Sequence, residues 1–371
     1  MPEAIDAESP VVALGGRSSR PKTFRLIQVL RAVAALMVVA HHATILVEQR
    51  WHRTGVFWAG GAAGVDIFFV ISGLVMTMSA QRVARSARGA WTFFQRRLER
   101  VVPLYWIATT TKVLLALALP ALAINANGTV WHVVASYLFI PSLSPAHTME
   151  PMLVVGWTLE IEMLFYLLYG ASFLLRISPW CTVAPAFLAL AYVRFGAVAP
   201  DSKVLLWGST LNFEFLWGMA LGACVLRGRY PATWLSAGLL VLGGALLFLT
   251  PLTFAEVWRP IVWGLPATAI VAGALGLERC LREAVPALVQ RLGDASYSIY
   301  LTHGLVLPLL GAGLSRITMK PGAITWLVMV LGLFLSSVVG LACYQWLELP
   351  MLRWFQLRRK ATPLRREAAA T

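Results

Sequence analysis

The sequence predicts an all-α membrane protein, a polytopic transmembrane helix bundle of about ten spans. Of its 371 residues, 58% are hydrophobic and only 13% are charged, and the mean hydropathy is +0.72. These values lie well outside the range of soluble globular domains. The apolar residues fall into separate runs of about 17 to 25, the length that a helix needs to cross a hydrocarbon core of about 30 Å. A β-barrel would need shorter, alternating segments, so the runs indicate helices.

Ten apolar runs are predicted to cross the membrane within one transmembrane domain, residues 24–350. A polar N-terminal tail at 1–23 precedes this domain, and a basic C-terminal tail at 351–371 follows it. The first run is too long for a signal-peptide core and lacks a convincing cleavage site, so we expect it to remain as a span. The predicted spans are 24–47, 56–80, 101–119, 153–175, 180–198, 204–226, 232–250, 260–277, 296–315 and 323–347.

The distribution of basic residues predicts that both termini are cytoplasmic. With the N-terminus inside, 22 of the 31 Lys and Arg residues lie in inner segments, counting Arg25 at the inner end of the first span, and six lie in outer ones. Cytoplasmic loops carry this excess in membrane proteins generally. The same loops explain the formal net charge of +14, so we expect no nucleic-acid partner.

One apolar stretch, residues 129–143, has an ambiguous role. It is only about 15 residues long and runs into the sequence PSLSP. Counting it as an eleventh span would place the basic C-terminus outside. We therefore interpret it as a re-entrant or interfacial segment of a long outer loop, 120–152.

Ionisable residues at membrane depth are the first candidates for function. The first predicted span contains Arg31, His41 and His42. Arg31 and His42 are eleven residues apart, so they share one helical face at a separation of about 16 Å. His41 points about 100° away, and packing is the simpler interpretation for it. The alternative for Arg31 is that it reaches back to the cytoplasmic interface.

Asp66 stands in the second span and needs a partner, because a lone carboxylate in hydrocarbon is costly. It either pairs with a cation such as Arg31 or orients a catalytic histidine. Both uses look alike in the sequence. Small residues in this span allow close helix approach, and they are Gly60, Gly61, Gly64, Ser72 and Gly73.

The fourth and ninth spans carry further ionisable groups. Glu160 and Glu162 are two residues apart and so lie about 200° apart around a helix, which leaves room for only one of them at a reaction cavity. His303 follows Tyr300 in the ninth span, and its simpler interpretation is a hydrogen-bonded core histidine.

Arg97 and Arg100 lie directly before the third span, on one turn of a helix. Guanidinium groups at this spacing suit phosphate oxygens. An anchor on anionic lipid is the alternative. The chain has no P-loop, GxGxxG turn, GxSxG elbow, HExxH or His/Cys cluster, so the sequence gives no support for nucleotide hydrolysis, dinucleotide binding or a metal.

Five motifs, in order, resemble those of the membrane-bound acyltransferase 3 family, which includes O-acyltransferases of bacterial exopolysaccharide, lipopolysaccharide O-antigen and Nod factor. The resemblance extends over residues 24 to 350. The motifs are LRAVAALMVVAHH, GVDIFFVISG, RRLERVVPLYW, GWTLEIEMLFYLLY and SYSIYLTHG.

The resemblance implies that His42 is the catalytic imidazole and that Arg31 supports it. It also implies that Arg97 and Arg100 help to bind acyl-CoA from the cytoplasm. Glu162 falls on the customary glutamate of its motif and, with Asp66 as the alternative, is expected to orient His42.

Two departures from the family pattern occur in the fourth span. Thr158 replaces the usual Ser, and Glu160 is an additional acid, so the identity of the orienting carboxylate stays open. We expect His303, Tyr300 and Trp157 to contribute to substrate binding.

The resulting hypothesis is an enzyme of the bacterial inner membrane that moves an acyl group, expected to be acetyl, from cytoplasmic acetyl-CoA to a hydroxyl of a polysaccharide or lipid-linked oligosaccharide. Membrane lipids would surround it. His42 would act as a general base or would carry the acyl group itself. The competing hypotheses are a transporter or flippase of a lipid-linked sugar and a non-catalytic scaffold.

Overall fold

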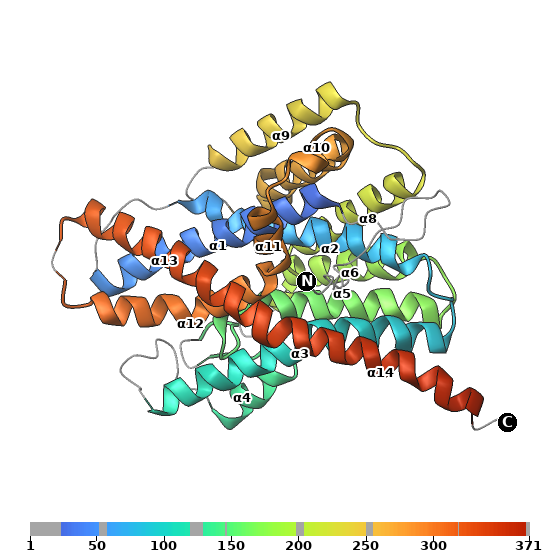
Figure 1. Ribbon diagram of the computed structural model, residues 1–371, viewed down its shortest axis with the longest axis horizontal. Coiled ribbons are helices and arrows are strands. Elements are labelled where there is room, and N and C mark those ends of the chain that lie inside the picture. Colours follow the sequence, from blue (N-terminus) through green and yellow to red (C-terminus); the bar gives the residue numbers. More distant parts are fainter. Residues whose placement is uncertain are drawn as a thin grey trace, which may run out of the picture.

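The apolar runs fold as helices that lie side by side, most of them along the long axis of the molecule (Figure 1). The computed structural model describes residues 24–51, 58–118, 129–144, 147–197, 204–249, 255–317 and 319–368. Within these ranges the chain is helical apart from loops and one isolated antiparallel bridge between Leu143 and Met149. The predicted N-terminal tail, 1–23, lies outside the described residues.

Fourteen α-helices are joined by short 3-10 and π-helical turns within the described ranges. The α-helices are α1 (Arg25–Trp51), α2 (Gly64–Ala80), α3 (Ala87–Ala118), α4 (Val130–Tyr137), α5 (Trp157–Leu174), α6 (Trp180–Ala197), α7 (Val204–Trp207), α8 (Asn212–Leu226), α9 (Thr233–Phe248), α10 (Leu265–Leu281), α11 (Ala287–Asp294), α12 (Ser296–Leu314), α13 (Pro321–Cys343) and α14 (Leu349–Ala368).

Seven helical segments in the described part of the chain are long and apolar enough to cross a membrane. They are Arg25–Trp51, Ala59–Ala80, Ala87–Ala118, Val154–Leu174, Glu256–Ala284, Ser296–Leu314 and Gly322–Arg359. Three shorter apolar helices, α6, α8 and α9, coincide with the remaining predicted spans. The ambiguous stretch at 129–143 contains only α4, an eight-residue helix that is too short to cross.

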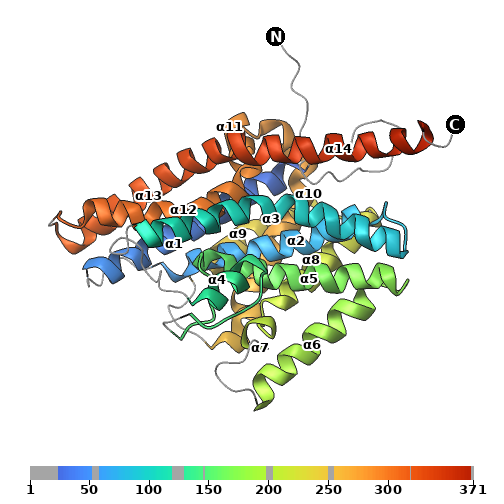
Figure 2. The same ribbon diagram turned by 90° about the horizontal axis from the view of Figure 1, so that it is seen from below.

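The turned view in Figure 2 places α11 and α14 along one margin of the bundle and α6 with α7 along the other. Helices α1, α2, α3, α5 and α12 lie between these margins. Their interior is dense with aromatic side chains, as the rings of Phe69 and Phe165 both stack on Phe215, at centroid distances of 4.4 and 4.3 Å. This apolar centre fixes α2, α5 and α8 around one another.

The start of α1 is held by a carboxylate from a distant helix. The backbone amides of Arg25 and Leu26 each donate to one oxygen of Glu278, both at 2.8 Å. Glu278 belongs to α10. A carboxylate at this position satisfies orphan amides and suits the positive end of the helix dipole, so it sets where α1 begins.

The last predicted span does not end where the basic tail begins. Helix α13 continues through a π-helical turn, η6 (Tyr344–Glu348), directly into α14. A second π-helical turn, η4 (Pro260–Gly264), leads into α10 in the same way. Each turn precedes a proline at the second position of the next helix, Pro350 or Pro266. The wider turn accommodates a residue that lacks an amide hydrogen, so the helix continues instead of breaking.

Helices α2 and α8 pack so closely that glycine is required on both sides. A Cβ atom on Gly73 would lie 2.1 Å from the carbonyl oxygen of Phe215, and one on Gly218 would lie 2.0 Å from that of Val70. The same holds where α2 meets α1, because a Cβ on Gly64 would lie 2.3 Å from the oxygen of Ala34. The close approach expected from the small residues of α2 is confirmed.

We therefore expect Gly218→Ala to destabilise the protein by ~1–3 kcal/mol, since the backbones must separate to admit the methyl group. Gly244→Ala in α9 is the matched control, because a Cβ there meets nothing within 4 Å. Thermal unfolding of the detergent-purified variants measures the difference. Equal midpoints for the two variants would contradict the close-packed interface.

Candidate active site

A cavity of about 130 Å³ lies among α1, α2, α3, α5 and α12. Five of the nine predicted site residues line it, and they are Arg31, Arg97, Arg100, Glu162 and Tyr300. Its remaining lining is mostly apolar. The helix bundle thus brings together arginines that are far apart in the sequence, in an enclosure of the kind that binds small molecules.

The three arginines of the cavity have incomplete sets of partners. The Nη2 of Arg97 donates to Ser79 Oγ at 2.9 Å, while its Nε is buried with no hydrogen-bond partner in the described residues. The Nη1 of Arg100 lies 3.7 Å from Glu348 Oε1, which is a long ion pair. The Nη1 of Arg31 donates to Gln28 Oε1 at 3.3 Å. These weak contacts leave donor capacity for an anion.

Glu162 faces this cavity and not the histidines. Its Oε1 accepts a hydrogen bond of 2.7 Å from Ser72 Oγ. Glu160 is buried on another side of α5, and neither of its oxygens has a hydrogen-bond partner in the described residues. The side chains of Glu160 and Glu162 therefore point to different sides of α5, as their spacing predicts. Glu162 is the one that lines the cavity.

His42 has a defined tautomer in the structure. Its Nδ1 lies 2.9 Å from the carbonyl oxygen of Val38. Because a carbonyl only accepts hydrogen bonds, Nδ1 carries the hydrogen and the neutral ring presents its lone pair at Nε2. The same argument applies to His41, whose Nδ1 lies 3.1 Å from the oxygen of Trp58. His42 is therefore able to act as a base through Nε2.

The ring of His42 contacts a histidine from a distant helix. The ring centroids of His42 and His303 are 5.0 Å apart, and those of His41 and His42 are 5.5 Å apart. His303 in α12 is completely buried, and its ring centroid lies 5.6 Å from that of Tyr300. The imidazoles of α1 and α12 therefore form one cluster.

Tyr300 connects the histidine cluster to the arginine cavity. Its hydroxyl lies 2.8 Å from Thr158 Oγ1 and donates to the carbonyl oxygen of Val155 at 2.9 Å. Both Tyr300 and Thr158 line the cavity. Thr158 thus keeps the hydroxyl of the serine that it replaces. Trp157 begins α5 and packs against the apolar core, and it is not among the residues that line the cavity.

Asp66 is held by a cation that the sequence analysis did not select. Its two oxygens accept from Nε and Nη2 of Arg259, at 3.1 and 2.8 Å. Arg259 was counted among the outer loops, but it is largely buried, with its guanidinium 4.5 Å from the ring of Trp263. The pair spans 193 residues of sequence, so no local pattern could reveal it. Arg259, and not Arg31, is the partner of Asp66.

In the described part of the chain, no three His, Cys, Asp or Glu side chains converge in a metal-binding arrangement. The candidate site therefore consists of two joined parts. Arginines surround a cavity, and a pair of imidazoles lies just beyond Tyr300. Fold and candidate site together indicate a membrane protein with a polar cavity and a histidine cluster inside its helix bundle.

The chain belongs to the acyltransferase 3 family. The family, described as an acyltransferase domain, matches residues 25–345. The protein is therefore a membrane acyltransferase.

Several curated proteins resemble the chain in sequence. The exopolysaccharide production protein ExoZ of Rhizobium meliloti (strain 1021) is 37% identical over 326 residues, which cover 85% of this chain and 98% of that protein. The acyltransferase MdmB of Streptomyces mycarofaciens is 29% identical over 67% of this chain and 68% of its own length. The peptidoglycan O-acetyltransferase OatA of Listeria monocytogenes is 26% identical over 52% of this chain and 32% of its own length. No solved structure matches the chain significantly.

The ion pair of Asp66 and Arg259 predicts a structural effect. Asp66→Ala removes both hydrogen bonds of the largely buried Arg259 and leaves the nearby acids Glu214 and Glu256 to balance its charge, so we expect a loss of about 1–3 kcal/mol in unfolding free energy. Replacing both residues, as Asp66→Leu with Arg259→Met, should recover only part of that loss, because the buried Glu214 then lacks this cation. Thermal unfolding and acyl transfer by the purified variants give the two readouts. A double variant that is stable but inactive would show that Asp66 serves the reaction itself.

Proposed function

We propose that the protein transfers an acetyl group from cytoplasmic acetyl-CoA to a hydroxyl of a polysaccharide or lipid-linked oligosaccharide in a bacterial inner membrane. The observation that carries the proposal is the junction at Tyr300 between the arginine cavity and the histidine pair. The names of two relatives, an exopolysaccharide production protein and a peptidoglycan O-acetyltransferase, support a carbohydrate acceptor and an acetyl group.

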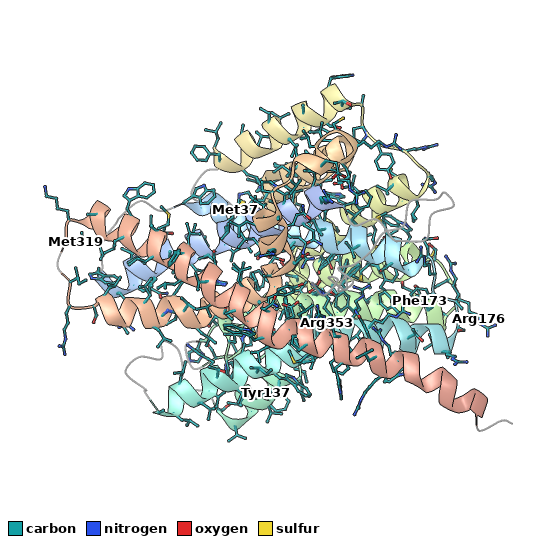
Figure 3. All side chains as sticks on the ribbon, in the orientation of Figure 1. Met37, Tyr137, Phe173, Arg176, Met319 and Arg353 are labelled. Carbon is teal, nitrogen blue, oxygen red and sulfur yellow. The ribbon has the colours of Figure 1, made fainter. Side chains whose placement is uncertain are left out.

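The proposed topology has ten spans with both termini in the cytoplasm. Met319, between α12 and α13, and Arg176, after α5, lie at opposite ends of the long axis (Figure 3). The excess of basic residues places the Arg176 end inside. Arg97 and Arg100 then lie on the inner side and His42 lies farther out, so donor and acceptor approach from opposite faces.

In this proposal the arginine cavity binds the donor. The phosphates of acetyl-CoA need cations, and Arg31, Arg97 and Arg100 supply guanidiniums whose present partners are weak or few. Glu162 faces these arginines, so its role would be to hold them in place more than to orient His42.

His42 carries the reaction in the proposed mechanism. Its Nε2 accepts the proton of the attacking hydroxyl, while the hydrogen bond from Nδ1 to Val38 fixes the ring. In the variant mechanism the same Nε2 attacks the thioester and carries the acetyl group. His303 and Tyr300 lie where the acetyl group would pass, which supports a role in substrate binding. Trp157 would contact the acceptor from the start of α5.

A transporter or flippase would also use buried ionisable residues. It would not need an imidazole with a basic Nε2 that is connected through His303 and Tyr300 to a cavity lined by three arginines. The two functions are therefore distinguished by whether a surface glycan carries an acyl group that depends on this protein.

Deletion of the gene should remove an O-acetyl group from a surface glycan, detected by NMR and mass spectrometry. Complementation with His42→Ala should leave the group absent while the variant is still inserted and folded, because Nε2 of His42 is the proposed base. His41→Ala should restore most of the acetylation. The reverse order of the two variants would move the reaction to His41, and acetylation near wild type with His42→Ala would exclude this mechanism.

Arg97→Ala with Arg100→Ala should weaken binding of acetyl-CoA by about tenfold or more, since each charged hydrogen bond contributes about 1.5–3 kcal/mol. The corresponding lysine variants should restore binding poorly if the contacts are bidentate. Calorimetry on the purified variants measures the affinity. If the residues only anchor the helix, affinity stays unchanged and lysine restores normal insertion.

The topology is testable with two single cysteines in a protein whose native cysteines have been replaced. Met319→Cys and Ile177→Cys are matched, because the native side chains are 40% and 39% exposed. In intact cells with a permeable outer layer, a membrane-impermeant thiol reagent should label only the cysteine at 319. Labelling at 177 from outside would reverse the proposed orientation.

A further inference from the structure

We propose that His303 is a second catalytic residue, which takes the proton from His42 and delivers it to the thiolate that leaves from acetyl-CoA. This inference rests on the proposed function. It gives a chemical role to a completely buried imidazole that the proposal above uses only for binding.

The spatial order of the residues supports this role. The ring of His303 contacts both that of His42, at 5.0 Å, and that of Tyr300, at 5.6 Å. Tyr300 lines the arginine cavity, whereas neither histidine does. A proton that moves from His42 to His303 therefore moves toward the cavity, where the sulfur of the donor would be released.

His303 has ring nitrogens available for such a transfer. Neither nitrogen makes a well-aligned hydrogen bond to a described residue, although the carbonyl oxygens of Ile299 and Tyr300 lie nearby on the same helix. A neutral imidazole carries one N–H and one lone pair in either tautomer. An unsatisfied buried polar ring is unfavourable in a fold, so its presence beside a base calls for a partner that is supplied during the reaction.

His42 needs an outlet for the proton that it accepts. Its Nδ1–H is bonded to Val38, so the proton from the hydroxyl must enter and leave through Nε2. Among the described residues, the imidazoles of His41 and His303 are in ring contact with it. The Nδ1 of His41 is hydrogen-bonded to the carbonyl oxygen of Trp58, whereas His303 adjoins the cavity through Tyr300.

The proposed step is balanced without an added reagent. The hydroxyl O–H bond breaks as its proton binds Nε2 of His42, the new C–O bond forms at the acetyl carbon, and the C–S bond breaks. His303 accepts the proton from His42 and then donates it to the sulfur, which forms the S–H bond of free coenzyme A. Both imidazoles return to neutral for the next turnover.

The test compares His303→Ala and His303→Gln with wild type in membrane vesicles that contain the glycan acceptor and receive radiolabelled acetyl-CoA. We expect kcat to fall by about 10²–10⁴-fold in both variants, with little change in KM for acetyl-CoA. Added imidazole should restore turnover of His303→Ala, because it fills the vacated space and transfers protons. Pyrrole has a similar ring but no basic nitrogen, so it should not restore turnover.

Three outcomes would overturn the proposal. They are kcat near wild type in either variant, equal rescue by pyrrole and imidazole, and a loss in His303→Ala that imidazole does not reverse although the thermal midpoint is unchanged. If His303→Ala does not fold, His303→Gln decides, since glutamine keeps the volume and hydrogen bonding but cannot relay a proton. Wild type that transfers no acetyl group would instead reject the proposed function.

Discussion

The cost of placing charge inside an apolar helix bundle governs this structure. Each buried ion needs a counter-ion or strong hydrogen bonds, and the protein meets that need to different degrees at different places. Asp66 and Arg259 satisfy each other through two short hydrogen bonds. Among the described residues, Arg100 makes a long ion pair with Glu348, and Arg97 keeps a buried Nε without a partner. The completely paired ions hold helices together, and the incompletely paired arginines are the ones proposed to bind the donor.

The same principle explains why the histidines differ in their surroundings. His42 gains one hydrogen bond by reaching back one turn to Val38, which costs the helix nothing and leaves Nε2 exposed to the interior. The completely buried His303 makes no well-aligned side-chain hydrogen bond to the described residues, and its ring contacts those of His42 and Tyr300.

Much of the fold could be predicted from the sequence because crossing a bilayer imposes simple requirements of length and polarity. Seven of the predicted spans overlap helices long enough to cross, whereas 204–226 is divided between α7 and α8, and the small residues of α2 mark a close contact with α8. The angular separation of Glu160 and Glu162 also predicts correctly that they diverge. These properties depend only on residues that are near each other in the chain.

Contacts between distant helices could not be predicted in this way. Nothing local identifies Arg259 as the partner of Asp66, and nothing local places His303 beside His42. Glu162 was expected near His42 because of its motif, yet its hydrogen bond goes to Ser72 on α2, within the arginine cavity. The last span was expected to end at 347, before a separate tail at 351–371, whereas α13 continues through the π-helical turn η6 into α14.

That π-helical turn joins α13 and α14 end to end, and Glu348 is its last residue. Glu348 is also the residue that faces Arg100 and accepts a hydrogen bond of 2.6 Å from Ser298. Beyond this turn, Arg359 of α14 pairs with Glu99 on the helix that carries Arg100. The C-terminal segment is therefore tied to α3 at two points, on either side of the start of α14. A helix that the sequence presents as a basic tail thus supports the helix that carries two of the cavity arginines.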